Sequence, residues 1–300
     1  RQVVFEKGTN GDAFFIISSG AVTIDPDGDL NRTLKRGACF GERALLFSEP
    51  RSAKVIIAEK GTRLWSAQRD VFEQFVTKNM RDDLVQRANL LDWTLSMKNL
   101  KHVRLVGAGS FGSVRLVEHV KTEARYALKR IRKEDGQVPE DVVRECALLA
   151  EVSHPFVLQL VKTFETVNSI YILTELITGG ELYAQMNERM GVVSRKHAQF
   201  YIGSLVLIME ALHQHGIIYR DLKPENVMLD AQGYLKLVDF GLAKKLDGAQ
   251  KTFSVVGTIY YMAPEVITAK GYSFEADFWS LGVMLFELVC GGLPFGEECA

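Results

Sequence analysis

The chain has 300 residues, 47% of them hydrophobic and 24% charged, so about two domains with ordinary packed cores are expected. This composition excludes a disordered chain, a collagen-like repeat and a small disulfide scaffold. The 36 basic and 37 acidic side chains give a net charge of -1, and we therefore expect no nucleic-acid partner. Four cysteines, spread far apart, favour a reducing, cytoplasmic setting over a disulfide framework or a zinc site.

The first part of the chain is predicted to be rich in short β-strands. Hydrophobic runs at 14–17, 21–24 and 55–57 are separated by glycine and Asp-Pro turns, which is typical of a barrel or a sandwich. From residue 69 to about residue 95 apolar side chains recur at helical spacing, so a helical segment is expected to follow the strands.

A second unit is predicted to begin near residue 100. Strands are expected at 114–118, 126–131 and 170–176, and helices at 139–150 and 197–213. The run 278–289 is apolar nearly all round, which is typical of a helix buried inside a domain.

A glycine-rich run opens this second unit. Its pattern GxGxxGxV is formed by Gly107, Gly109, Gly112 and Val114. By itself the run is a weak signal, because dinucleotide-binding folds carry similar glycines and a plain hairpin turn can look the same. Here a second strand follows the glycines where a dinucleotide fold would have a helix. The run is therefore interpreted as a flap whose backbone amides approach phosphate groups.

Three side chains after the glycine run are consistent with a site that binds a nucleotide. Ala127 and Lys129 point to the same face of their predicted strand, where Ala127 leaves room for a flat base and Lys129 reaches phosphates. Glu145 lies on the apolar face of the predicted helix 139–150, where a carboxylate is costly unless it is paired. We expect Glu145 to pair with Lys129, and a solvated surface lysine is the alternative.

Three further motifs follow in order along the chain. They are Tyr-Arg-Asp-Leu-Lys-Pro-Glu-Asn at 219–226, Asp-Phe-Gly at 239–241 and Ala-Pro-Glu at 263–265. Together with the glycine run and Lys129, they resemble the protein kinase family. The match is closest to the branch that includes the cyclic-nucleotide-dependent kinases, because Tyr219 replaces the usual histidine. The resemblance implies a bilobal kinase fold that uses ATP and Mg²⁺.

The resemblance also implies roles for individual side chains in phosphoryl transfer. Asp221 would accept the proton of the substrate hydroxyl or orient it, and Lys223 would neutralise the transferred phosphoryl group. Asn226 and Asp239 would bind Mg²⁺ through hard oxygen ligands. A hydrophobic spine resting on the helix of Asp277 would consist of Leu149, Leu160, Tyr219 and Phe240.

By the same resemblance, the adenine of ATP would lie against the end of the strand 170–176. Glu175 and Leu176 would offer backbone groups to adenine, and Glu181 would lie near the nucleotide. Thr174 would be the gatekeeper, whose small side chain leaves a pocket behind the adenine.

The resemblance further implies that Ser254 carries an activating phosphate, with Arg220 and Lys244 as its cationic partners. Thr258 is expected to contact the catalytic aspartate and lysine. The expected substrates are proteins phosphorylated on Ser or Thr near basic residues. They would be recognised by Glu181, Glu225, Thr258 and Glu287.

A distinctive cassette lies in the first part of the chain. Gly-Ala-Cys-Phe-Gly-Glu-Arg-Ala-Leu-Leu at 37–46 is followed by Pro-Arg-Ser-Ala. It resembles the phosphate-binding cassette of cyclic-nucleotide-binding domains, which are jelly-roll β-barrels with flanking helices. Glu42 would then accept a hydrogen bond from the ribose 2′-hydroxyl, and Arg51 would pair with the cyclic phosphate. Further contacts would come from Gly41 and Ala44. The alternative is a generic β-barrel with an incidental arginine.

Ser52 bears on which nucleotide is bound. A hydroxyl directly after Arg51 can bond the guanine amino group of a syn nucleotide, and sites for cAMP in this family usually carry alanine there. Binding of cGMP is therefore favoured over cAMP. Arg43 replaces a more usual leucine and would also border the nucleotide. We expect Asp92 to pair with Arg43, and a solvent-exposed arginine is the alternative.

The sequence thus predicts an α+β chain: a cyclic-nucleotide-binding domain at 1–78, a helical linker at 79–99 and a protein kinase domain at 100–300. The first domain is expected to be incomplete at its N-terminus and the kinase domain to be truncated in its C-lobe. The implied function is a cGMP-regulated Ser/Thr protein kinase, resembling the apicomplexan type, that transfers the ATP γ-phosphate. Alternatives are a cAMP-dependent or dual-nucleotide kinase, and a nucleotide-binding module whose kinase part is inactive.

Overall fold

The computed structural model describes residues 2–25, 32–90, 92, 95–109, 112–186 and 192–296. The chain forms two compact units, each discontinuous in sequence. The first comprises Arg1–Lys129, Val161–Phe164 and Tyr171–Thr174, and the second comprises Arg130–Leu160, Glu165–Ile170 and Glu175–Ala300. The first unit therefore joins the expected nucleotide-binding domain to the opening strands of the expected kinase domain.

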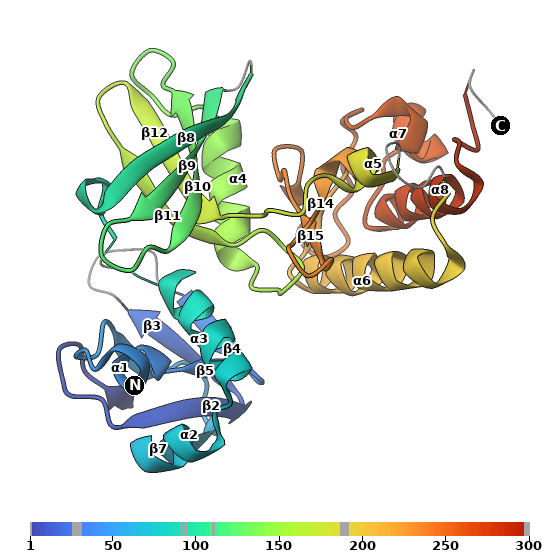
Figure 1. The fold of residues 1–300 in the computed structure, drawn as a ribbon. Helices are drawn as coiled ribbons and strands as arrows, with labels where there is room; N and C mark the ends of the chain where they lie inside the picture. Colours follow the sequence, from blue (N-terminus) through green and yellow to red (C-terminus); the bar gives the residue numbers. More distant parts are fainter. Residues whose placement is uncertain are drawn as a thin grey trace. The chain divides into compact units, whose positions relative to one another are not determined.

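The N-terminal strands of the first unit form two antiparallel sheets (Figure 1), ordered β1-β6-β3-β4 and β5-β2-β7. The strands are β1 (Val3–Phe5), β2 (Ala13–Ser19), β3 (Ala21–Asp25), β4 (Arg32–Lys35), β5 (Cys39–Phe40), β6 (Lys54–Ile57) and β7 (Arg63–Gln68). The expected strands at 14–17, 21–24 and 55–57 are present in β2, β3 and β6. Of the two expected arrangements, a barrel or a sandwich, the described residues form two separate sheets whose ladders do not close into a barrel. Gly20, at a φ of 79°, carries the chain from one sheet to the other.

The core between these two sheets is apolar and closely packed. Ile17 and Val22 are fully buried, and Phe40 and Val55 pack with them. Burial of each such side chain contributes about 1.5–3 kcal/mol to folding. Three helices complete this part: α1 (Glu42–Phe47), α2 (Arg69–Phe75) and α3 (Lys78–Leu90). The helical segment expected at 69–95 is thus two helices, because Val76 adopts an extended conformation between them.

A five-stranded sheet follows the 3₁₀ turn η1 (Met97–Asn99) and has the order β11-β12-β10-β9-β8. Its strands are β8 (Leu100–Gly109), β9 (Gly112–His119), β10 (Arg125–Arg132), β11 (Leu160–Glu165) and β12 (Ser169–Glu175). Leu95, which precedes the sheet, is buried in one cluster with Val117, Tyr126 and Leu173. Leu95 therefore belongs to the core of this sheet.

The second unit is mainly helical, and its helices are α4 (Glu140–Glu151), α5 (Leu182–Gln185), α6 (Arg195–Gln214), α7 (Pro264–Ile267) and α8 (Glu275–Cys290). Its short strands and 3₁₀ turns are β13 (Ile217–Ile218), η3 (Pro224–Asn226), β14 (Val227–Leu229), β15 (Leu235–Leu237), β16 (Lys244–Lys245) and η4 (Ile259–Tyr261). Helices α6 and α8 pack against each other, and α6 buries Leu205, Ile208 and Leu212 completely.

Helix α8 departs from its sequence-based expectation. The helix is present, but Phe278 is 49% exposed and Phe286 is 38% exposed, so it is not buried all round. A helix that is apolar all round is normally buried on every face. In the described residues only one face of α8 is buried, and this face includes Met284 and Leu288. None of the helices in the described ranges combines the length and the apolar character needed to cross a membrane.

Candidate functional site

Asp221 lies at the centre of a hydrogen-bonded group in the second unit. Its Oδ2 is 3.0 Å from Lys223 Nζ and accepts a hydrogen bond from Asn226 Nδ2 at 2.9 Å. Its Oδ1 accepts a hydrogen bond from the Thr258 hydroxyl at 2.8 Å. That hydroxyl in turn accepts one from Lys223 Nζ at 2.8 Å, so the contacts expected for Thr258 are present. Three neighbours therefore fix the orientation of the Asp221 carboxylate.

A β-hairpin brings Asn226 and Asp239 to the same end of two strands. In this hairpin β14 pairs with β15, with Val227 opposite Leu237, and the Val238 N–H donates to Asn226 O at 3.0 Å. Asn226 Nδ2 donates to Asp221, which leaves the amide oxygen Oδ1 as an acceptor.

The oxygens of Asn226 and Asp239 suit a hard cation. Asp239 Oδ1 accepts the Gly241 N–H at 3.1 Å, which orients the carboxylate. One carboxylate and one amide oxygen fit Mg²⁺, which usually keeps several waters and phosphate oxygens as its other ligands. The described residues contain no group of three or more His, Cys, Asp and Glu side chains that could bind a metal by themselves.

Asp277 in α8 fixes the backbone next to Asp221. It is fully buried, and its two oxygens accept the N–H groups of Tyr219 at 2.9 Å and Arg220 at 2.8 Å. Arg220 has a φ of 71°, in the left-handed region that non-glycine residues seldom adopt, and such strain persists only where the surroundings hold it. The Tyr219 ring packs edge-on against Phe240 at 5.4 Å between centroids. All members of the expected spine are buried, namely Leu149, Leu160, Tyr219 and Phe240.

The segment proposed to carry a phosphate lies beside a cation. Ser254 is exposed, and its hydroxyl accepts a hydrogen bond from Arg220 Nη1 at 2.8 Å. Arg220 Nε also donates to Leu242 O at 2.6 Å, which holds the guanidinium in place. Lys244 contacts Thr252 Oγ1 at 3.3 Å, and that atom is 3.3 Å from the Ser254 hydroxyl. Both expected cations therefore lie in the same hydrogen-bonded group, and Arg220 contacts Ser254 directly.

Two of the acidic residues expected to recognise substrate influence one another. Glu287 is buried, and its Oε2 accepts a hydrogen bond from the Tyr261 hydroxyl at 2.6 Å. Burial raises the pKa of Glu287, and the charge of Glu225 raises it further. Glu225 and Glu181 are exposed. Glu287 is therefore buried and hydrogen-bonded to Tyr261, whereas Glu225 is exposed to solvent.

The residues expected to bind ATP are divided between the two units. Those in the first unit are Gly107, Gly109, Gly112, Val114, Ala127, Lys129 and Thr174, and those in the second are Glu145, Glu175, Leu176 and Glu181. The tip of the glycine run, residues 110–111, lies outside the described residues. Glu145 is buried as expected, and its pairing with Lys129 stays a prediction. The backbone N–H of Glu175 donates to Gln159 O at 3.1 Å, so this N–H already has a partner.

The cassette of the first unit places two opposite charges in its interior. Glu42 begins α1 directly after Gly41, whose φ is 87°, and a Cβ on Gly41 would lie 2.6 Å from Arg51 Nη1. Arg51 Nη1 donates to Gly41 O at 2.8 Å and Nη2 to Ala13 O at 2.7 Å. Its guanidinium also lies over the Phe5 ring at 4.2 Å. Glycine at position 41 therefore lets the arginine approach the start of α1.

Both charged groups of the cassette keep an unsatisfied polar atom. Glu42 is 4% exposed and Arg51 5% exposed, and neither Glu42 Oε2 nor Arg51 Nε has a hydrogen-bond partner among the described residues. Burial raises the pKa of Glu42 and lowers that of Arg51, so both charges are disfavoured in this environment. Buried polar groups are normally paired, and a ligand with one hydroxyl and one anion would satisfy both.

The cavity that these groups line is small. Its lining includes Glu42, Arg43, Ala44, Arg51 and Ser52, and its volume is about 50 Å³. Pockets for small molecules typically measure about 300–1,000 Å³. A nucleotide can therefore enter only if lining side chains move.

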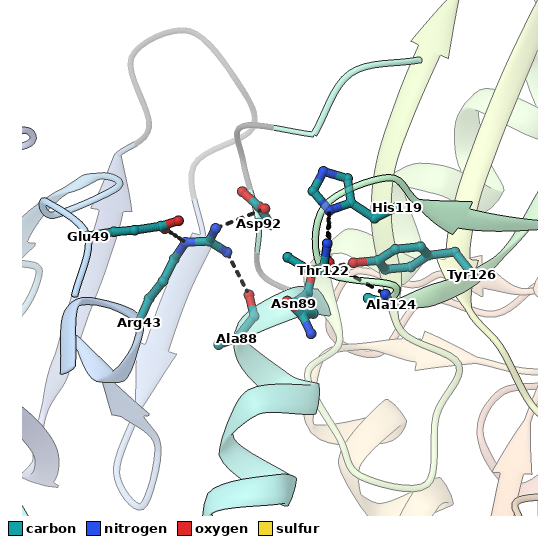
Figure 2. Close-up of polar contacts among 9 residues, drawn as sticks. All are labelled: Arg43, Glu49, Ala88, Asn89, Asp92, His119, Thr122, Ala124 and Tyr126. Atoms are coloured by element: carbon teal, nitrogen blue, oxygen red, sulfur yellow. Dashed lines mark hydrogen bonds and ion pairs between the residues drawn. The ribbon is translucent and has the colours of Figure 1, made fainter. Parts of the chain in front are cut away.

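Arg43 connects this cavity to the end of α3 (Figure 2). Its guanidinium is 3.1 Å from Asp92 Oδ2 and 3.0 Å from Glu49 Oε2, and Nη1 donates to Ala88 O at 3.4 Å. The Arg43 side chain is 12% exposed and that of Asp92 4%. The expected pairing of Arg43 with Asp92 is thus present, and the alternative of a solvent-exposed arginine is wrong.

Some contacts around the cassette were not foreseen from the sequence. Arg87 in α3 donates to Cys39 O at 3.3 Å, and Arg69 donates to Ala44 O at 3.2 Å. Tyr126 in β10 donates to Asn89 O at 3.1 Å. Each involves a backbone carbonyl, which carries no side-chain signal in the sequence.

Comparison with known proteins agrees with this organisation. Residues 100–299 match the protein kinase domain, and residues 1–79 match the cyclic nucleotide-binding domain. The chain is 45% identical over 300 residues to a protein named cGMP-dependent protein kinase in Toxoplasma gondii, covering 99% of the chain and 30% of that protein. It is 47% identical over 298 residues to the protein of the same name in Eimeria tenella, covering 98% and 29%.

A human relative, named cGMP-dependent protein kinase 2, is 35% identical over 339 residues, covering 97% of the chain and 44% of that protein. The chain thus spans less than a third of the two protist relatives and under half of the human one.

Proposed function

Because this chain belongs to the protein kinase family and has a cyclic nucleotide-binding domain ahead of its kinase domain, we propose that it is part of a cGMP-regulated serine/threonine protein kinase. The observation that carries the regulatory part is the buried Glu42–Arg51 pair with its two unsatisfied atoms. The observation that carries the catalytic part is the ordered group around Asp221.

In this proposal the chain's own residues position the reacting groups. Asp221, fixed by Asn226 and Thr258, accepts a hydrogen bond from the substrate hydroxyl and orients its oxygen for attack on phosphorus. Lys223 lies 3.0 Å from the same carboxylate and neutralises charge on the transferred phosphoryl group. Such preorganised charges act without reorganisation during the reaction.

Asn226 and Asp239 would hold Mg²⁺, since their oxygens are oriented by hydrogen bonds and match its ligand preference. When bound, Mg²⁺ would supply positive charge that neutralises the phosphate oxygens of ATP.

The ATP cosubstrate is proposed to lie against the expected residues of both units. Gly107, Gly109 and Gly112 would cover the phosphates, and Lys129 would reach them while paired with Glu145. The remaining contacts to the nucleotide would come from Val114, Ala127, Thr174, Glu175, Leu176 and Glu181. Support comes from the family membership and from the burial of Glu145.

Basic protein substrates and an activating phosphate complete the catalytic part. Glu225 and Glu181 are exposed carboxylates that suit basic side chains, and Glu287 adds charge nearby. Ser254 already accepts a hydrogen bond from Arg220, and a phosphate there would gain a charge-assisted contact.

The ligand of the cassette is proposed to be cGMP. Its ribose 2′-hydroxyl would donate to Glu42, its cyclic phosphate would pair with Arg51, and Ser52 would accept from the guanine amino group. Ser52 lines the same cavity as the two charged residues. We place the protein in the cytoplasm, which is supported by the lack of a disulfide at the described cysteines, Cys39, Cys146 and Cys290.

Two assays on the full-length protein test the two halves separately. Asp221→Asn should lower phosphate transfer to a basic Ser/Thr peptide by about 10²–10⁴-fold while leaving cGMP binding intact. Arg51→Gln should weaken cGMP binding in calorimetry by at least about tenfold, since a charge-assisted contact is lost. Wild-type protein that binds cAMP more tightly than cGMP would contradict the choice of nucleotide. Protein that binds cGMP but transfers no phosphate would favour a nucleotide-binding module with an inactive kinase part.

A further inference from the structure

The last turn of α3 is capped from two sides. The final four carbonyls of a helix have no partner within the helix and need donors from elsewhere. Ala88 O accepts from Arg43 Nη1 at 3.4 Å, and Asn89 O accepts from the Tyr126 hydroxyl at 3.1 Å (Figure 2). The first donor comes from the nucleotide cassette and the second from β10. One helix end therefore connects the cavity to the five-stranded sheet.

Tyr126 holds β10 from the core side of the sheet. It is 1% exposed and packs with Leu95, Val117 and Leu128. Because side chains alternate along a strand, Tyr126 and Leu128 share this face, while Lys129 projects from the other face of the same strand. Burial, followed by the charge of Asp92, raises the pKa of Tyr126 to about 12, so its hydroxyl remains a donor at neutral pH.

The two caps are also joined by Asp92. Its backbone N–H donates to Asn89 O at 3.3 Å, the same carbonyl that Tyr126 contacts. Its carboxylate is paired with Arg43 at 3.1 Å. If Arg43 moves, its contacts to Ala88 and Asp92 change, and both of these residues are connected to Asn89, Ala88 as its neighbour in α3 and Asp92 through the Asn89 carbonyl. Arg43 is one of the residues that line a cavity of about 50 Å³, and this cavity must widen for a nucleotide, so ligand entry would change the surroundings of Arg43.

We propose that Tyr126 is the positioning residue through which occupancy of the cassette is transmitted to the strand that carries Lys129. This proposal rests on the proposed regulation by cGMP and names the contacts through which the cassette would influence β10. Tyr126 does not line the cavity of the cassette and is not among the residues expected to bind ATP or substrate. It acts through its hydrogen bond to the end of α3, so that a change in the conformation of that end changes the placement of β10.

The test is Tyr126→Phe in the full-length protein, a change that keeps the ring and removes only the hydroxyl. The ratio of phosphate-transfer rates with and without saturating cGMP should fall about fivefold, the effect of one neutral hydrogen bond. Binding free energies are coupled reciprocally, so cGMP and a non-hydrolysable ATP analogue should change each other's affinity by the same factor, and this factor should shrink in Tyr126→Phe. A purely structural role would instead lower both rates together and leave their ratio unchanged.

Tyr201→Phe is the matched control, because Tyr201 is a buried tyrosine of α6 in the second unit. Its activation ratio should equal that of the wild type. A measurement on wild-type protein adds independent evidence: cGMP should alter amide hydrogen exchange in the last turn of α3 and in β10 together. Unchanged exchange in β10, or full activation of Tyr126→Phe, would overturn the inference alone. Wild-type protein that does not respond to cGMP would overturn the proposed function and the inference with it.

Discussion

At the scale of single residues, the buried Asp277 carboxylate is held in one orientation by hydrogen bonds from its neighbours. Asp277 has no exposed surface, yet His213 lies 2.8 Å from its Oδ2 and two backbone N–H groups donate to its oxygens. Glu42 and Arg51 are the contrasting case, because each is buried with one atom unsatisfied. Asp277 thus stabilises the fold, whereas the other two are suited to a ligand.

Ser52 gives a prediction about selectivity. Ser52→Ala should weaken cGMP binding about fivefold, because one neutral hydrogen bond contributes about 1 kcal/mol, and should leave cAMP binding unchanged. Calorimetry with both nucleotides measures this. Ser66→Ala, at an exposed position of β7, is the control and should change neither affinity. Equal weakening of both nucleotides by Ser52→Ala would contradict a contact to the guanine.

Tyr126 gives a prediction about alkaline pH. Its folded-state pKa of about 12 exceeds the usual value of 10.0, so its contribution to stability is complete below pH 10 and is lost as pH rises through 12. The stability difference between the wild type and Tyr126→Phe should therefore shift by about 1 kcal/mol against the wild type between pH 9 and pH 11. Urea unfolding at the two pH values measures the shift, and a constant difference would count against the burial of a neutral hydroxyl.

At the scale of elements, α3 depends on contacts beyond its own sequence. Its C-terminal carbonyls are capped by Arg43 and Tyr126, and Leu90 packs against the core of the five-stranded sheet. A cation at a helix C-terminus also interacts favourably with the helix dipole. The end of α3 therefore contacts both the nucleotide cassette, through Arg43, and the five-stranded sheet, through Tyr126.

Removal of the Arg43 side chain tests this dependence. Arg43→Ala should destabilise the protein by roughly 3 kcal/mol, because Asp92 is left as a buried charge without its arginine. Glu49→Ala removes the exposed partner of the same arginine and should cost less than about 1 kcal/mol. Denaturant unfolding compares the two. A cost for Arg43→Ala no larger than that for Glu49→Ala would refute the role assigned to the buried pair.

Elements defined by local patterns were predicted well from the sequence. The strands β2, β3 and β6, the helix α6 and the burial of Glu145 follow from hydrophobic spacing alone. For the N-terminal strands the sequence left a barrel and a sandwich open, and it did not predict which strands pair, because strand pairing depends on long-range contacts that leave no local pattern. The exposed face of α8 was missed for a related reason: composition reveals an apolar surface but not which neighbours cover it.

The candidate site shows the same limit. The family resemblance predicted the contact between Thr258 and Asp221, and the charges of Arg43 and Asp92 predicted their pairing; the structure contains both. The bond from Tyr126 to the carbonyl of Asn89 could not be foreseen, since any residue at position 89 offers the same carbonyl.

At the scale of the whole molecule, one chain carries both the nucleotide cassette and the proposed phosphoryl-transfer site. A ligand changes activity only if it interacts differently with the two states of the protein. The collapsed cavity provides such a difference, because its lining must move before a nucleotide can bind. The proposed regulation of phosphate transfer by cGMP therefore requires both an intact nucleotide cassette and an intact group around Asp221.

The most direct test is the rate of phosphate transfer from ATP to a basic Ser/Thr peptide as cGMP is titrated into the full-length protein. The wild type should be activated, Arg51→Gln should need at least about tenfold more cGMP, and Asp221→Asn should stay inactive at every concentration. A wild-type rate that is independent of cGMP, or a titration unchanged by Arg51→Gln, would contradict the account.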